Sequence, residues 1–125
     1  MNASLASLIA RITMAELFLP AGLSKIFGYA GTAGFMESQG VPGLLLPGVI
    51  ALEVLGGLAL LAGFQMRYAA WALAAFTLVT ALLFHRNLGD QTQMVMFFKN
   101  FAIVGGLIAL SALGAGAYSV DGRRA

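Results

Sequence analysis

The chain has 125 residues, of which 60% are hydrophobic and only 10% are charged, whereas soluble domains average about 45–50% apolar and about 25% charged residues. A single domain of this length cannot bury so much apolar surface, so the composition indicates a membrane protein and excludes soluble enzymes. Seven basic and five acidic residues give a net charge of +2, which is too small and too scattered for a surface that binds nucleic acid.

Four apolar stretches are each long enough to cross a membrane, which takes about 20 mostly apolar residues. In chain order, we expect spans at about 5–23, 44–64, 68–85 and 94–117. The last two contain the clearest charge-free runs, whereas the first two carry charged residues that we interpret as functional. The sequence therefore predicts an all-α fold, an integral membrane four-helix bundle in which residues 1–125 form one transmembrane domain.

The connections indicate how the bundle sits in the membrane. The longest one, residues 24–43, mixes aromatic side chains with glycine and polar residues, and we expect it to lie in the membrane interface. Four spans place both termini on one side, and that side carries more basic residues, so the positive-inside rule predicts cytoplasmic termini. The residues compared are Arg67, Arg123 and Arg124 on the terminal side, and Lys25 and Arg86 on the other.

Polar residues inside the spans fall on helix faces that point into the bundle. Lys99 and Glu53 each share a face with small residues, which are typical of close helix contacts. By helical rise, Glu53 lies about 13 Å into its span and Lys99 about 8 Å into its own, both in the half away from the termini. We therefore expect one polar cluster in that half, opening toward the non-cytoplasmic side. Its members are Glu16, Glu53, His85, Lys99 and Asn100.

Two interpretations of this cluster are open. Glu53 and Lys99 could form a buried ion pair that fixes helix register, a role that need not add stability. Alternatively, the cluster is a proton relay, a binding site for a quinone headgroup or a solute site, because charges within a bilayer are usually functional. Arg11 lies nearer the termini, and we expect its side chain to snorkel to the membrane surface.

The residue types present also limit the cofactors. The chain has no cysteine and a single histidine, His85. It therefore cannot form a thiolate site or a multi-histidine zinc site, and it cannot supply both ligands of a bis-histidine haem. We expect no metal site and no intrinsic cofactor.

Several short motifs, in this order, resemble those of the DoxX family of small four-helix membrane proteins. They are AGLSKIFG at residues 21–28, LEVLGGLALLAGF at residues 52–64 and LGAGAYSVD at residues 113–121. The last motif usually reads G-P-G-R-Y-S-L-D in relatives, so the arginine of that motif has no counterpart in this chain. Besides Glu53, the positions that match the family pattern are Arg11, Gly22, Lys25, Gly56, Gly57, Gly63, Arg67, Gly114, Gly116, Tyr118, Ser119 and Asp121.

The resemblance implies a location in the bacterial inner (plasma) membrane and a link to redox chemistry. Relatives include a subunit of a thiosulfate:quinone oxidoreductase and partners of membrane-associated redox complexes. The resemblance therefore implies an accessory, quinone-linked subunit with redox partners. Our first hypothesis is that Glu53, Lys99 and His85 line its site for a quinone or a small inorganic substrate. Two other functions stay open from the residues: a small dimeric proton-coupled transporter, and a non-catalytic membrane scaffold.

Overall fold

The computed structural model describes the backbone of residues 1–124 and the side chains of residues 1–123. This part of the chain is all-α, as predicted, and four of its helical segments are long and apolar enough to cross a membrane. The elements are α1 (Ala3–Phe27), α2 (Tyr29–Ser38), the 3-10 helix η1 (Gly43–Leu45), α3 (Leu46–Ala62), α4 (Met66–Phe84), α5 (Gln91–Leu113) and α6 (Val120–Arg124).

The bounds differ most from the expected spans at two helix ends, each by four residues. The first helix does not end at residue 23 but continues through Pro20 to Phe27, which brings the first part of the expected interfacial connection into α1. The last long helix ends at Leu113, before the expected residue 117. There Gly114 adopts a φ of +86°, a left-handed conformation that favours glycine and breaks the helix.

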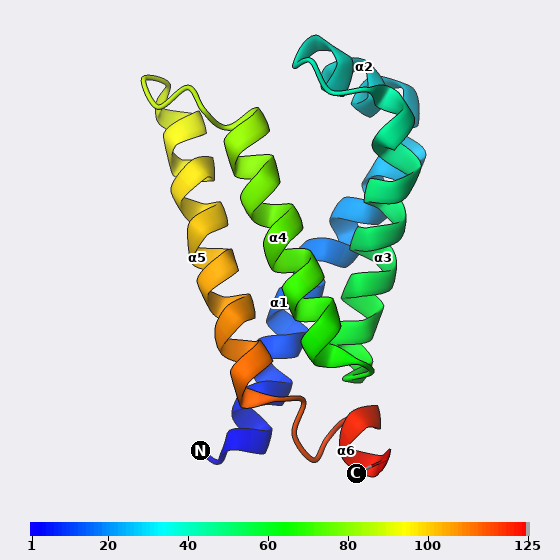
Figure 1. Cartoon of the computed structure of the whole chain (residues 1–125), viewed down its shortest axis with the longest axis vertical. Coiled ribbons are helices and arrows are strands. Elements are labelled where there is room, and N and C mark those ends of the chain that lie inside the picture. The colour runs from blue at the N-terminus through cyan, green and yellow to red at the C-terminus, as the bar shows by residue number, and fades with distance from the viewer. Residues whose placement is uncertain (125) are drawn as a thin grey trace.

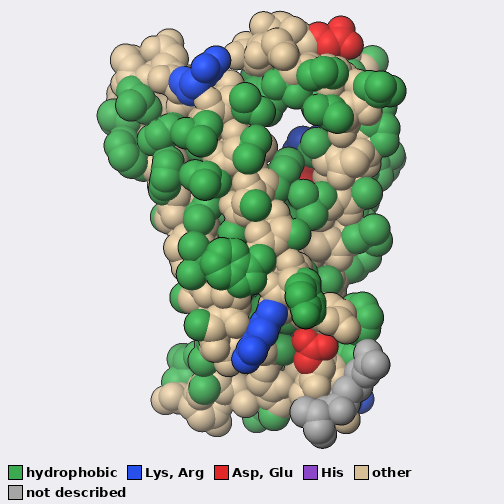
Figure 2. Space-filling view, viewed as in Figure 1, with side chains coloured by type: hydrophobic (Ala, Val, Ile, Leu, Met, Phe, Trp, Pro, Cys, Tyr) green, Lys and Arg blue, Asp and Glu red, His purple; other side chains and the backbone are tan. Residues whose placement is uncertain are grey.

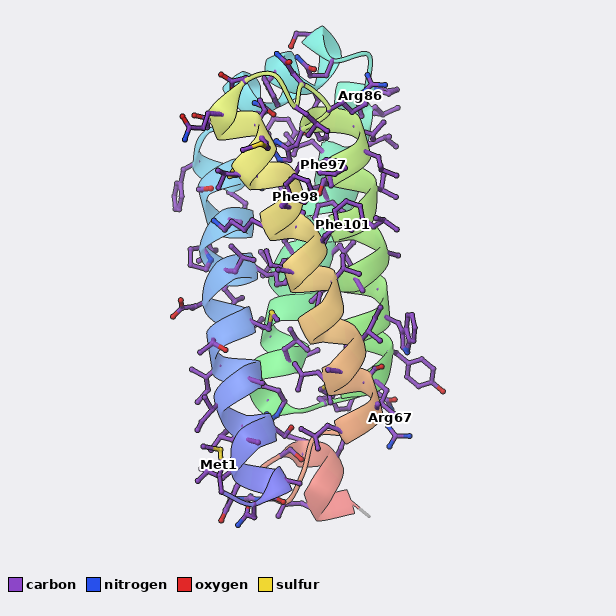
Figure 3. All side chains as sticks on the ribbon, turned by 90° about the vertical axis from the view of Figure 1, so that its left-hand side faces the viewer. Met1, Arg67, Arg86, Phe97, Phe98 and Phe101 are labelled. Atoms are coloured by element: carbon purple, nitrogen blue, oxygen red, sulfur yellow. The ribbon has the colours of Figure 1, made fainter. Side chains whose placement is uncertain are left out.

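The four long helices form two closely packed pairs. One pair is α1 with α3, and the other is α4 with α5. The pairs meet near the end of the bundle that holds both chain termini and diverge toward the other end, where α2 lies across the first pair (Figure 1). Seen from the side, α5 lies in front, between α1 and α4, and the labelled residues Arg67 and Arg86 mark opposite ends of the bundle (Figure 3).

Glycines let α1 and α3 approach closely. A Cβ atom on Gly22 would lie 2.7 Å from Cγ2 of Val54, and one on Gly57 would lie 2.8 Å from Cγ of Leu19. Neither position has room for a side chain, so the two backbones meet directly, as small residues permit in membrane helix pairs. This contact fixes the face that α3 turns toward α1, and Glu53 lies on that face at the level of Gly22, where an added Cβ would lie 3.1 Å from Cβ of Glu53.

The apolar core fills the half of the bundle where the two pairs meet. Its buried residues come from all four long helices and from the segment after α5. They are Phe18, Leu60, Met66, Ala70, Leu73, Ala74, Leu107, Leu110 and Ala115. In the other half of the bundle, away from the chain termini, the pairs separate, and side chains do not fill the space between them.

Candidate functional site

A cavity of about 450 Å³ lies between the diverging helix pairs, in the half of the bundle away from the termini. Its wall is mostly apolar, with contributions from α1, α2, α3, α4 and α5. The space-filling view shows an opening through the molecule in this half, with a basic and an acidic side chain visible inside it (Figure 2). A mostly apolar cavity of this size with a few polar groups is typical of a site for a small molecule.

The α1–α3 wall of the cavity carries an ion pair. Nζ of Lys25 lies 2.8 Å from Oε1 of Glu53, and Glu53 is only 4% exposed. Within residues 1–123, no hydroxyl or backbone N–H donates a hydrogen bond to the Glu53 carboxylate. The ammonium of Lys25 is thus the charge partner of Glu53, and the carboxylate keeps acceptor capacity toward the cavity.

The α4–α5 wall carries neutral polar groups beside the ammonium of Lys99. Nδ2 of Asn100 donates to the carbonyl oxygen of Thr77 and to Oγ1 of Thr80, both at 3.2 Å. Nδ1 of His85 lies 2.9 Å from the side-chain oxygen of Gln93. Because an amide oxygen only accepts, Nδ1 carries the hydrogen in this arrangement, and in the neutral imidazole Nε2 is then an acceptor. The second wall therefore presents acceptors and amide groups opposite the ion pair.

The structure brings four of the five predicted cluster residues together. Glu53, His85, Lys99 and Asn100 all line the cavity. Glu16 does not: it is exposed on the outer face of α1. The expected inward direction of Glu16 is therefore wrong, because that residue lies opposite the buried face of its helix, which carries Ser7, Arg11, Ala15, Phe18 and Gly22.

The pairing of Glu53 also differs from the hypothesis. Its partner is Lys25 and not Lys99, which has no ion-pair partner among the described residues. Lys25 belongs to the turn of α1 that was expected to be part of the connection, and the extra turn points it at α3. The signal was present in the sequence, since Phe18, Gly22 and Lys25 follow the spacing of one helix face.

Arg11 does not snorkel to the surface. Its side chain is fully buried, and its guanidinium donates to the carbonyl oxygens of Leu60 at 3.1 Å, Leu61 at 3.0 Å and Tyr118 at 2.8 Å. These carbonyls belong to the end of α3 and to the segment after α5. Arg11 therefore joins three parts of the chain at the end of the bundle that holds the termini.

Most remaining positions of the family pattern gather around Arg11. The carboxylate of Asp121 accepts hydrogen bonds from the backbone N–H groups of Gln65 at 2.8 Å and Met66 at 3.0 Å, which caps the start of α4. Oγ of Ser119 accepts from the N–H of Gly122 at 2.9 Å. A Cβ atom on Gly63 would collide with Ser119 and approach Arg11. These residues hold the C-terminal segment under the bundle, and they lie outside the cavity.

The fold and the cavity define a small multi-pass membrane protein with an internal polar site. A model of the DoxX family matches residues 6–86, and the chain belongs to this family. It is 54% identical over 114 residues to inner membrane protein YqjF of Escherichia coli (strain K12), covering 91% of this chain and 88% of that protein. It is 36% identical over 123 residues to inner membrane protein YphA of the same organism, covering 93% and 88%. No solved structure matches the chain. The protein is therefore a multi-pass inner-membrane protein of the DoxX family.

Proposed function

We propose that the protein binds a quinone in the cavity between its helix pairs and acts as a quinone-binding, accessory subunit of a membrane redox assembly. The observation that carries the proposal is the buried ion pair of Lys25 and Glu53, which lines a mostly apolar cavity of about 450 Å³ within the spanning helices. A ring with an oxygen at each side and an apolar tail matches such a lining, because the polar groups stand on two opposite walls.

The polar residues of the two walls supply both donors and acceptors of hydrogen bonds for such a headgroup. The ammonium groups of Lys25 and Lys99 supply hydrogen-bond donors for the oxygens of the ring, and Asn100 and the Nε2 atom of His85 supply acceptors for a hydroxyl. The opening in the wall (Figure 2) gives the apolar tail a path into the bilayer.

A bound quinone supplies two-electron chemistry, taking up two electrons and two protons to become the quinol. Glu53 is the group placed to hold one of those protons beside Lys25, because its carboxylate has no hydrogen-bond donor from the described backbone or hydroxyl groups. The electrons come from a reduced partner subunit, since the sequence contains no haem, flavin or cluster motif.

The proposal is tested by measuring quinone bound to the protein purified from its own membranes in a mild detergent. Ubiquinone and menaquinone are extracted and quantified per mole of protein, and a short-chain quinone is titrated into delipidated protein. We expect Glu53→Gln to weaken binding by about tenfold or more, because Lys25 then loses the charge partner that holds its ammonium at the site. Ala21→Phe, which fills the cavity, should have the same effect without changing any charge.

The matched control is Glu16→Gln, which makes the same change on the neighbouring helix outside the cavity. It should bind quinone as the unchanged protein does. Equal binding by all three variants, each folded and monodisperse, would overturn the proposal. The proposal would also be overturned if the unchanged protein bound no quinone but bound a polar solute that Ala21→Phe does not bind. That result would favour the transporter.

A further inference from the structure

Glu16 lies in an unusual place for a carboxyl group. It is 13 residues after the start of α1 and 11 residues before its end, so it lies about 20 Å from one end and about 17 Å from the other. Its side chain is exposed on the outside of the bundle and has no hydrogen-bond or ion-pair partner among residues 1–123. An ionisable group at mid-membrane normally faces the interior of a bundle and is paired.

The surroundings of Glu16 form a continuous outward face of α1. Ile9, Ile12, Glu16 and Leu23 share this face by helical spacing, and the three apolar residues are 45%, 46% and 46% exposed. Pro20 lies on the same face, and because it has no N–H, the carbonyl of Glu16 lacks its usual helical donor. The face is thus mostly apolar. The hydroxyl of its exposed Thr13 is satisfied by the carbonyls of Ile9 and Ala10, so Glu16 is its one unpaired polar side chain among the described residues.

We propose that this face of α1 is the interface of a symmetric dimer in which Glu16 of one copy meets Glu16 of the second. A two-fold axis along the membrane normal places equivalent residues at the same depth, so Glu16 and the apolar residues around it meet their counterparts in the second copy. Two carboxyl groups that share a proton donate and accept hydrogen bonds between them, and such contacts hold helices together in membranes. A second copy therefore supplies the partner that this chain does not provide for Glu16.

The second unpaired charge in a span, Lys99, does not serve this purpose. Lys99 lines the cavity, whereas the buried face of α1 turns toward that cavity and Glu16 turns away from it. Ser7 donates to the carbonyl of Gly114, which aligns the two helices at one end. From that level, Glu16 lies about 13 Å and Lys99 about 22 Å along the helices. Glu16 of one copy therefore cannot contact Lys99 of a second copy in this dimer, because the two residues point in different directions and lie at different depths in the membrane.

The test uses the absence of cysteine from the chain. Ile12→Cys places one thiol a helical turn from Glu16, and Ile108→Cys places a control thiol on the exposed side of α5, at a similar exposure of 42%. Oxidation in native inner membranes should give a disulfide-linked dimer of the Ile12→Cys protein only. Adding Glu16→Leu should lower the yield about tenfold, whereas Glu16→Gln, which still donates and accepts, should preserve it.

Three results would overturn the proposal. Equal cross-linking through Ile108→Cys would indicate random collision, and unchanged cross-linking in Glu16→Leu would show that the carboxyl group does not hold the copies together. Loss of the dimer in Lys99→Met would indicate a contact between Glu16 and Lys99. Because Glu16 lies outside the cavity, quinone binding is measured on the same membranes, and the failure of one proposal leaves the other unaffected.

Discussion

The polar side chains at the two ends of the bundle have different kinds of partner. At the end with the termini, Arg11 and Asp121 hydrogen-bond to backbone groups, and every such contact ties separate segments together. At the other end, Lys25 of α1 and Glu53 of α3 pair with each other on one wall of the open cavity between the helix pairs. The first arrangement uses polar side chains to close the fold, and the second keeps them available to a ligand.

The difference explains why the family motifs fall into two groups. The positions near residues 113–121, together with Arg11 and Gly63, hold the C-terminal segment in place. The positions near residues 22–25 and 53–57 bring α1 against α3 and expose one ion pair to the cavity. A motif in a small membrane protein can therefore mark a structural junction as readily as a binding site.

The largest effect should come from removing Arg11. In Arg11→Met, the carbonyls of Leu60, Leu61 and Tyr118 lose their donor while still buried, which should lower the stability of the protein by about 3 kcal/mol or more. The measurement is the temperature at which the purified protein loses its monodisperse peak in detergent. Arg86→Met, at the opposite end and exposed, is the control. A midpoint for Arg11→Met that matches this control would mean that the terminal end is not held by the guanidinium.

A smaller effect is expected from Asp121, which caps α4 from outside that helix. Asp121→Ala removes the acceptor for the N–H groups of Gln65 and Met66, and should cost about 1–2 kcal/mol. Asp121→Asn keeps one acceptor oxygen, so its stability should lie between that of the unchanged protein and that of Asp121→Ala. The same thermal measurement checks the order. If alanine and asparagine behave alike, the contact acts through charge, and the comparison of the two ends would need revision.

The fold could be predicted because membrane spans depend on length and composition alone. The prediction for Arg11 was wrong because it depends on contacts between residues that are distant in the sequence. Arg11 was expected at the surface because its periodicity does not reveal that the carbonyl of Tyr118, 107 residues away, lies beside it. The outward direction of Glu16 was in fact available: it is five residues from Arg11, about 140° around the helix, so the two side chains cannot both point into the bundle.

The cavity itself could not be predicted, although four of its polar residues could. Helix faces indicate which residues turn inward, but they do not tell whether two helix pairs pack together or diverge. That outcome depends on the large residues of the core at one end and on α2 holding α1 and α3 at the other. The partner of Glu53 was missed for a simpler reason, because Pro20 does not end α1 and the helix continues to include Lys25.

The smallest effect on stability should come from replacing the ion pair as a unit. In the double variant Lys25→Met with Glu53→Leu, both charges leave together, and a buried pair exchanged for apolar residues is often neutral or stabilising. We expect a change within about 1 kcal/mol in the thermal measurement, together with loss of quinone binding, whereas Glu53→Leu alone leaves Lys25 unpaired and should be less stable than the double variant. A double variant as unstable as Arg11→Met would mean that the ion pair holds the bundle together just as Arg11 does. Full retention of both stability and binding would instead show that the ion pair is not part of the quinone site, because a site whose charged groups hold the headgroup cannot lose both charges without weaker binding.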